Sequence, residues 1–131
     1  MQSLKAFQTA FKVEPVRFEF SDFAKDGAFS SPEVVDALKA EGIDHVLLKP
    51  LTSEQRAAFE ASIVGKDGKS RDMSNLYARY VAMCWVDEEG KPMGTPKEIG
   101  ALRADLVADI FEKVQEVNGV HKDSIEDAGK D

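Results

Sequence analysis

The feature that most constrains the fold is a long apolar stripe in the last third of the chain. It starts at Thr95-Pro96-Lys97-Glu98, where threonine can cap free N–H groups, proline suits the first helical position and glutamate completes a capping box. Apolar residues then recur every three or four positions: Ile99, Leu102, Leu106, Ile110, Val114 and Val117. The pattern predicts one helix over 95–118, ending at Gly119. At the usual rise per residue it would be about 35 Å long, close to the diameter of the whole domain.

The length and composition are those of one soluble domain. The chain has 131 residues, of which 43% are hydrophobic and 31% charged, which is an ordinary balance for a globular protein with a core. We expect a single globular domain over residues 1–122, including an amphipathic N-terminal segment at 3–12. Residues 123–131 are expected to form a polar acidic tail.

Two segments have the pattern of strands. Residues 16–20 alternate apolar and charged side chains, as in a strand with one buried face, and residues 43–48 form an apolar run before Pro50. Helical patterns are expected over 3–12, 32–41, 53–64, 73–85 and 95–118, with a connector at 65–72. With about five helices and a small two-stranded antiparallel sheet, the predicted fold class is mainly α (α+β).

Two of these helices have further sequence signals. Thr52 and Gln55 predict a capping box at the start of helix 53–64. Helix 73–85 is apolar over a wide arc, so we expect it to be central. Its large side chains exceed what one face can bury, and they lie either in the core or on a partner-binding surface: Tyr77, Tyr80, Met83 and Trp85.

Charge and hydropathy exclude several classes of partner. The net charge is −7 and the lysines and arginines are dispersed, so direct binding to nucleic acid is not expected. No apolar run approaches the roughly 20 residues of a membrane span, and the N-terminus lacks the pattern of a signal peptide. We therefore expect a cytoplasmic protein. The lone Cys84 cannot form an internal disulfide, in agreement with a reducing compartment.

The residues that could carry chemistry form no convincing site. Cys84 could be a nucleophile, but it lies in an apolar helical segment and is expected to be a buried structural residue. His45 and His121 lack the spacing of a metal site, and Asp87-Glu88-Glu89 lacks that of a calcium loop. We expect no enzymatic activity, no cofactor and no metal.

The N-terminal segment has a second open interpretation. Leu4, Phe7 and Phe11 lie at helical spacing, and a helix of this length is too short to be stable alone. It packs either on its own core or on a partner, as a latch into a neighbouring subunit or as a contact for a client helix.

Two ordered blocks carry a family resemblance. They are LLKPLTSEQRAAFEASIVG at 47–65 and NLYARYVAMCWVDEEGKPM at 75–93, followed by a helix ending in VNG at 117–119 and the acidic end SIEDAGKD. In this order, over residues 45–127, the chain resembles the tail assembly chaperones of long-tailed bacteriophages, of the siphophage type. The resemblance does not extend to residues 21–42.

The resemblance implies a non-enzymatic chaperone in the host cytoplasm. Such proteins bind the long helical tape measure protein and keep it soluble while the tail tube assembles, and the mature virion lacks them. The implied partners also include further copies of the chain, a longer form made by ribosomal frameshifting, and the tail tube protein. The residues expected to make the contacts are Leu4, Phe7, Phe11, Tyr77 and Tyr80. The alternatives are a small structural tail component and, less favoured, a hydrolase that uses Cys84.

Overall fold

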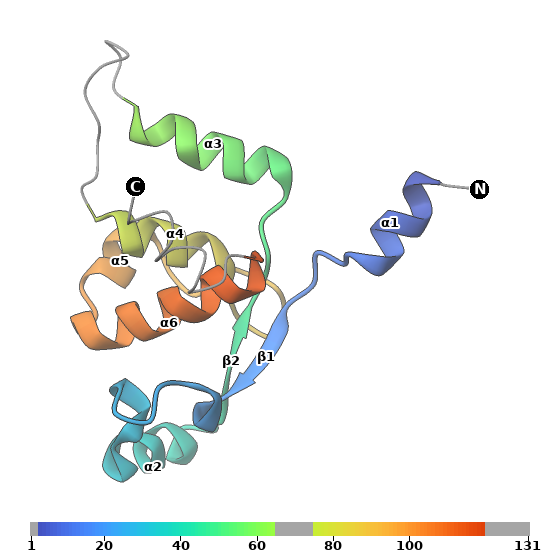
Figure 1. Ribbon diagram of the computed structural model, residues 1–131. Coiled ribbons are helices and arrows are strands. Elements are labelled where there is room, and N and C mark those ends of the chain that lie inside the picture. Colours follow the sequence, from blue (N-terminus) through green and yellow to red (C-terminus); the bar gives the residue numbers. More distant parts are fainter. Residues whose placement is uncertain (1–2, 65–74, 120–131) are drawn as a thin grey trace.

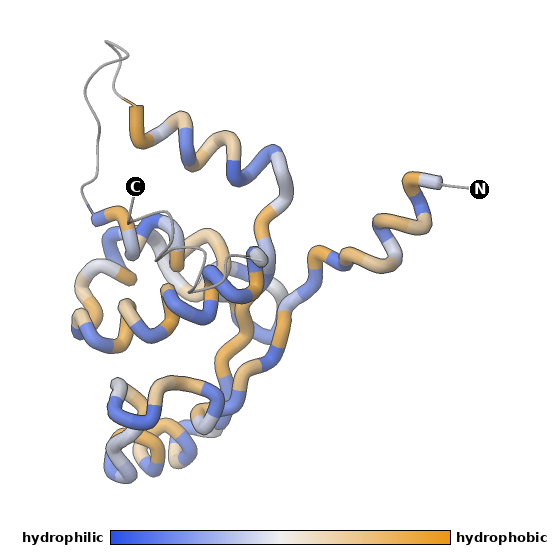
Figure 2. The backbone as a smooth tube through the Cα atoms, in the orientation of Figure 1, coloured by the Kyte–Doolittle hydropathy of each residue, from blue (hydrophilic) through white to orange (hydrophobic). Residues whose placement is uncertain are grey.

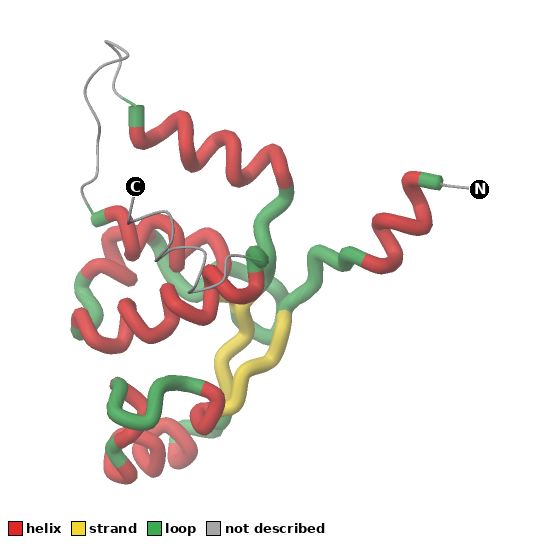
Figure 3. Tube along the Cα trace, viewed as in Figure 1, coloured by secondary structure: helices red, strands yellow, loops and turns green. Residues whose placement is uncertain are grey.

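The structure is a computed structural model that describes residues 3–64 and 75–119. These residues form six α-helices, two short 3₁₀-helices and a small sheet (Figures 1 and 3). In chain order the elements are α1 (Leu4–Ala10), β1 (Val16–Glu19), η1 (Phe20–Asp22), η2 (Ala28–Ser30), α2 (Pro32–Ala40), β2 (His45–Leu48), α3 (Ser53–Ile63), α4 (Leu76–Cys84), β3 (Trp85–Val86), α5 (Pro96–Gly100) and α6 (Ala104–Val117). The predicted mainly helical α+β class is confirmed. The predicted connector 65–72 and tail 123–131 lie outside the described residues.

The sheet has three antiparallel strands in the order β1-β2-β3, one more than predicted. Val16 pairs with Leu48 at one end of β1 and Glu19 with His45 at the other, while Leu48 also pairs with Trp85. The third strand was missed because it has two residues and begins where α4 ends. The helix predicted to reach Trp85 therefore stops one residue earlier.

The first strand is less buried than its alternating pattern predicted. Val16 is 44% exposed and Phe18 is half-buried, because β1 is an edge strand. Burial on this side begins at Phe20, which is in η1 rather than in the strand.

The core lies where α4, α6 and β2 meet. Its most deeply buried side chains are Leu48, Val81, Cys84, Ile110 and Val114, all fully inaccessible to solvent. Helix α4 packs against both α5 and α6, so the prediction that this helix is central is confirmed. The capping box of Thr52 and Gln55 is also present at the start of α3.

The predicted helix over 95–118 is wrong as one continuous element. It starts as expected, with Thr95 and Glu98 forming the capping box, but it breaks between Gly100 and Ala104. The side chain of Asn75 fills the space beside Gly100 where any larger residue would have its Cβ, and Asn75 Nδ2 donates a hydrogen bond to the Pro96 carbonyl at 3.1 Å. Arg103 is extended, with φ −60° and ψ 136°. The apolar spacing continues across the break, so periodicity alone could not reveal it.

Residues 20–42 form a separate layer at the end of the sheet away from α1 (Figure 1), which we call the α2 lobe. Phe29 stacks on Phe20 with ring centroids 4.9 Å apart, and Phe23 lies 4.7 Å from Phe29. The lobe is fastened to α6 because the Ala28 N–H donates to Asp109 Oδ2 at 2.6 Å. A Cβ at Gly27 would collide with the same carboxylate, so this close approach requires glycine.

Asn118, at the end of α6, connects three elements. Its Oδ1 accepts the Leu51 N–H at 2.7 Å, and its Nδ2 donates to the Val114 carbonyl at 2.8 Å and approaches Cys84 Sγ at 3.8 Å. These contacts fix the end of α6 against the segment that follows β2 and against the end of α4.

Replacing Asn118 with alanine should lower the free energy of unfolding by about 1–3 kcal/mol, because the half-buried Leu51 N–H loses its acceptor. Chemical denaturation followed by circular dichroism measures this change. Glu112→Ala, at an exposed position of the same helix, is the control and should stay within about 0.5 kcal/mol. Equal stability of the two variants would contradict a connecting role for Asn118.

Candidate partner-binding surfaces

The first surface is α1, which extends from the N-terminal end of β1 away from the remainder of the structure (Figure 1). Ser3 caps it by accepting the Ala6 N–H at 3.2 Å, so a helix forms as predicted. None of its residues is buried. Leu4 and Phe11 are 76% exposed and Phe7 is 51% exposed. Helix α1 therefore does not pack on the core of its own chain, and the hydrophobic residues that Figure 2 shows along it lack a partner within the described residues.

The charge of this segment is opposite to that of the whole chain. Residues 3–13 contain Lys5 and Lys12 and no acidic residue, whereas the net charge of the chain is −7. The segment is thus a basic amphipathic arm on an acidic body, and electrostatics favour its contact with an acidic surface.

The second surface is the exposed side of α4. The Tyr77 ring stacks on Phe111 with centroids 4.4 Å apart, yet Tyr77 remains 53% exposed. It borders a hollow of about 430 Å³ whose lining includes Leu102, which is 39% exposed. We call Tyr77, Leu102 and this hollow the Tyr77 surface.

Tyr80 has a different environment from Tyr77, although both were predicted to contact a partner. Its ring lies edge-on to Phe59 at 5.0 Å and to Phe111 at 5.6 Å, and it is half-buried between α3 and α6. Desolvation raises the pKa of its hydroxyl. Met83 and Trp85 are likewise partly buried against the core. Of the four large side chains of this arc, Tyr77 alone is more than half exposed.

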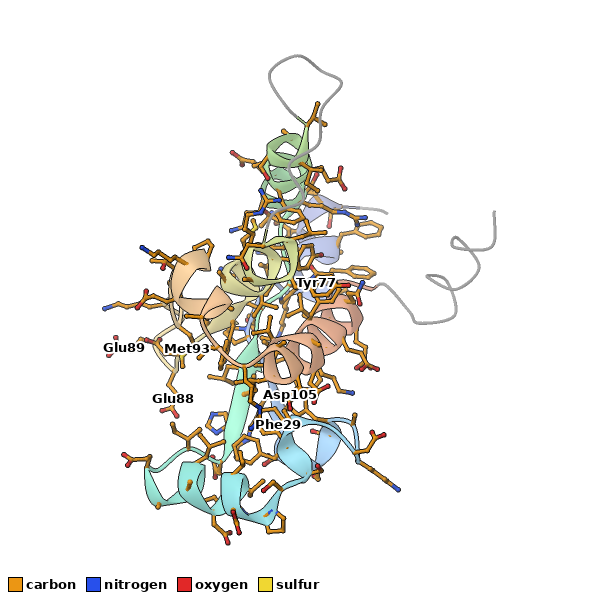
Figure 4. The ribbon with its side chains drawn as sticks, turned by 90° about the vertical axis from the view of Figure 1, so that its left-hand side faces the viewer. Phe29, Tyr77, Glu88, Glu89, Met93 and Asp105 are labelled. Atoms are coloured by element: carbon orange, nitrogen blue, oxygen red, sulfur yellow. The ribbon has the colours of Figure 1, made fainter. Side chains whose placement is uncertain are left out.

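The third surface is a hollow of about 650 Å³ between the α2 lobe and the turn that follows β3. Figure 4 shows Glu88, Glu89 and Met93 at one edge of the molecule, above α2. Its apolar lining includes Phe29, Ile43, Val46, Trp85, Met93 and Leu106, and its rim carries Asp87, Glu88 and Glu89. Ile43 is 41% and Met93 48% exposed. We call this hollow the acidic groove. It was not predicted, because its walls come from segments far apart in the sequence.

The carboxylates of the rim are held by a tight turn. Asp87 Oδ1 accepts the N–H groups of Glu89 at 2.8 Å and of Lys91 at 3.0 Å. The side chain of Glu88 is 79% exposed, 3.7 Å from His45 Nε2, and that of Glu89 is 73% exposed, 3.3 Å from Lys91 Nζ. The Glu89–Lys91 pair is exposed on both sides and therefore weak, and the Glu88 carboxylate itself is largely exposed. Both carboxylates therefore remain available to an incoming cation.

Cys84 is buried, as predicted. It is fully inaccessible, and burial raises the pKa of its thiol to about 11. Among the described residues the hydrogen-bond partner of its sulfur is Asn118. His45 instead contacts Asp44 at 2.6 Å, which lowers the pKa of the Asp44 carboxyl, and His121 lies outside the described residues. Within the described residues, Cys84 is therefore not a reactive thiolate beside a base, as the hydrolase interpretation would require.

Over the same ranges, no cluster of three or more histidine, cysteine or acidic side chains could hold a metal ion. None of the helices described is long and apolar enough to cross a membrane. Comparison with known proteins yields no match to any family model, curated protein or solved structure.

Native Cys84 should react with a thiol reagent at least about 100-fold more slowly than the denatured chain near neutral pH. The reason is that the thiol is inaccessible and that a pKa of about 11 leaves few thiolates to react. The rate in the native state should rise as the pH approaches 11. Labelling followed by mass spectrometry measures both rates. Equal rates in native and denatured chains would contradict the burial and revive the hydrolase interpretation.

Proposed function

We propose that this chain is a tail assembly chaperone of a long-tailed bacteriophage. It binds the tape measure protein, keeps it soluble while the tail tube assembles, and is absent from the mature virion. The observation that most supports this function is the combination of exposed large apolar side chains with an acidic body. Leu4, Phe7, Phe11 and Tyr77 are all more than half exposed, and the chain has a net charge of −7.

This combination suits a protein that holds an aggregation-prone client. Apolar surface on the chaperone covers apolar surface on the client, so the population of client able to aggregate falls by mass action. The net charge keeps both the chaperone and its complex dispersed. No catalytic group is needed for such a role, and the buried Cys84 fits a chain that works by binding alone.

The Tyr77 surface has the shape to receive a helical client. A helix presents apolar residues three and four positions apart, and an exposed aromatic ring beside a hollow is the usual form of an interface anchor. Tyr77 and Leu102 flank a hollow of about 430 Å³, which is large enough to bind one client side chain.

The further partners follow from the same proposal. They are other copies of the chain, a frameshifted longer form that shares this body, and the tail tube protein that displaces the client during assembly. The proposed place of action is the host cytoplasm. Mass spectrometry of purified particles should then detect no stoichiometric amount of the chain, and its presence would favour the structural-component alternative.

Co-expression with the tape measure protein of the same phage should increase the soluble fraction of that protein, and the two should co-purify. Tyr77→Asp should weaken binding roughly 30-fold, as expected for loss of an interface anchor of about 2 kcal/mol. Helix α4 tolerates aspartate there because the position is in its first turn.

Val64→Ser is the matched control, since Val64 is 50% exposed at the end of α3 and lies outside both hollows. It should co-purify like the wild type. A client that stays insoluble with the wild-type chain, and fails to co-purify, would overturn the proposed function.

A further inference from the structure

Helix α1 requires a covering surface that residues 3–64 and 75–119 of its own chain do not supply. It has seven residues and buries none of them, whereas isolated helices shorter than about 12–15 residues are marginal in water. Phe7 and Phe11 are also large enough to bury roughly 150–250 Å² each when fully covered. A helix of this length with this exposure is typical of an arm that is stabilised on a partner.

The acidic groove is an apolar surface that no described segment of the chain fills. Ile43 and Met93 are exposed within it, and its volume of about 650 Å³ is large enough for bulky side chains. The groove therefore offers the kind of surface that α1 needs.

The charges of the arm and the groove are complementary. Lys5 and Lys12 are the charged side chains of residues 3–13, and the groove carries Asp87, Glu88 and Glu89 on its rim. Such complementarity selects a partner and its orientation as well as adding attraction. An acidic arm would be repelled from this rim.

The groove that α1 reaches belongs to another molecule. The groove runs along β2 from His45, opposite Glu19, to Leu47, opposite Arg17, and the arm joins the sheet beside it at Val16. In the structure α1 points away from the remainder of its own molecule (Figure 1). The groove that the arm can fill without reversing its direction is therefore that of a second copy.

We propose that α1 of one copy occupies the acidic groove of a second copy, and that the exchange is reciprocal. Leu4, Phe7 and Phe11 then contact Ile43 and Met93 of the other molecule, with Lys5 and Lys12 at the carboxylates of the rim. Reciprocal exchange closes the assembly as a two-fold dimer. Two arms and two grooves double the area that a single contact would bury, toward the roughly 1,200–2,000 Å² of stable complexes.

This dimer deepens one part of the proposed function, namely self-association, and rests on that part alone. It covers the apolar residues of α1 and leaves the Tyr77 surface to the client. Because the purified chain is sufficient to test it, failure of the dimer and failure of client binding are distinguishable.

Sedimentation velocity of the full purified chain should show a dimer that dissociates more readily as salt rises. Phe7→Asp with Phe11→Asp, and separately Ile43→Asp with Met93→Asp, should each weaken the dimer at least about tenfold. All four residues are exposed, so circular dichroism should show that both variants fold. Val64→Ser serves again as the control and should remain dimeric.

A charge exchange tests the pairing itself. Lys5→Glu with Lys12→Glu, or Glu88→Lys with Glu89→Lys, should each weaken the dimer about tenfold, and the quadruple variant should recover it. Lack of recovery would overturn the assigned contact. A monomeric wild-type chain would also overturn it, whether hydrogen exchange shows α1 to be free or protected on its own molecule. A dimer that persists in the Phe7→Asp, Phe11→Asp variant would overturn it as well.

Discussion

The arrangement of the core depends on how the end of α6 is held against the segment after β2. Asn118 makes this connection with a side chain that both accepts and donates, bonding to the Leu51 N–H and the Val114 carbonyl. Leu48 and Val114, both fully buried, lie close to these polar contacts in sequence. One amide therefore satisfies the Leu51 N–H and bonds the Val114 carbonyl beside the apolar core where α6, α4 and the sheet meet.

Local chemistry explains which parts of this fold could be predicted. The capping boxes at Thr52 and Thr95 depend on residues three apart, so the starts of α3 and α5 were found correctly. The close packing at Gly100, the last residue of α5, involves instead Asn75, which is more than twenty positions away in the chain. The two-residue β3 likewise exists only because Leu47 and Leu48 pair with it. Long-range contacts of this kind leave no periodic signal in the sequence.

The same distinction applies to the candidate surfaces. The apolar spacing of α1 was visible in the sequence, but its lack of a partner was not, since burial is a property of the whole molecule. Tyr77 and Tyr80 have the same chemistry three positions apart, and packing against Phe59 distinguishes them. The acidic groove could not be predicted because one wall, the α2 lobe, is held in place by the Asp109 carboxylate on α6. Residues 21–42, outside the family resemblance, thus contribute Phe29, Leu38 and Gly42 to the surface that we assign to self-association.

A chain that holds an apolar client must expose apolar residues without aggregating through them. If an exposed apolar stripe bound a different surface on any neighbouring molecule, each added molecule would offer a new free stripe and open-ended polymers would form. Such growth stops only when the contacts form a closed assembly. In the dimer that we propose, reciprocal exchange of α1 closes the contact after two copies, and the acidic rim admits a basic arm while opposing acidic surfaces. The Tyr77 surface lies on α4 and α6, away from the arm, and so remains open in the dimer. In the proposed dimer, specific pairing of one apolar surface is therefore what allows the other to stay exposed without aggregation.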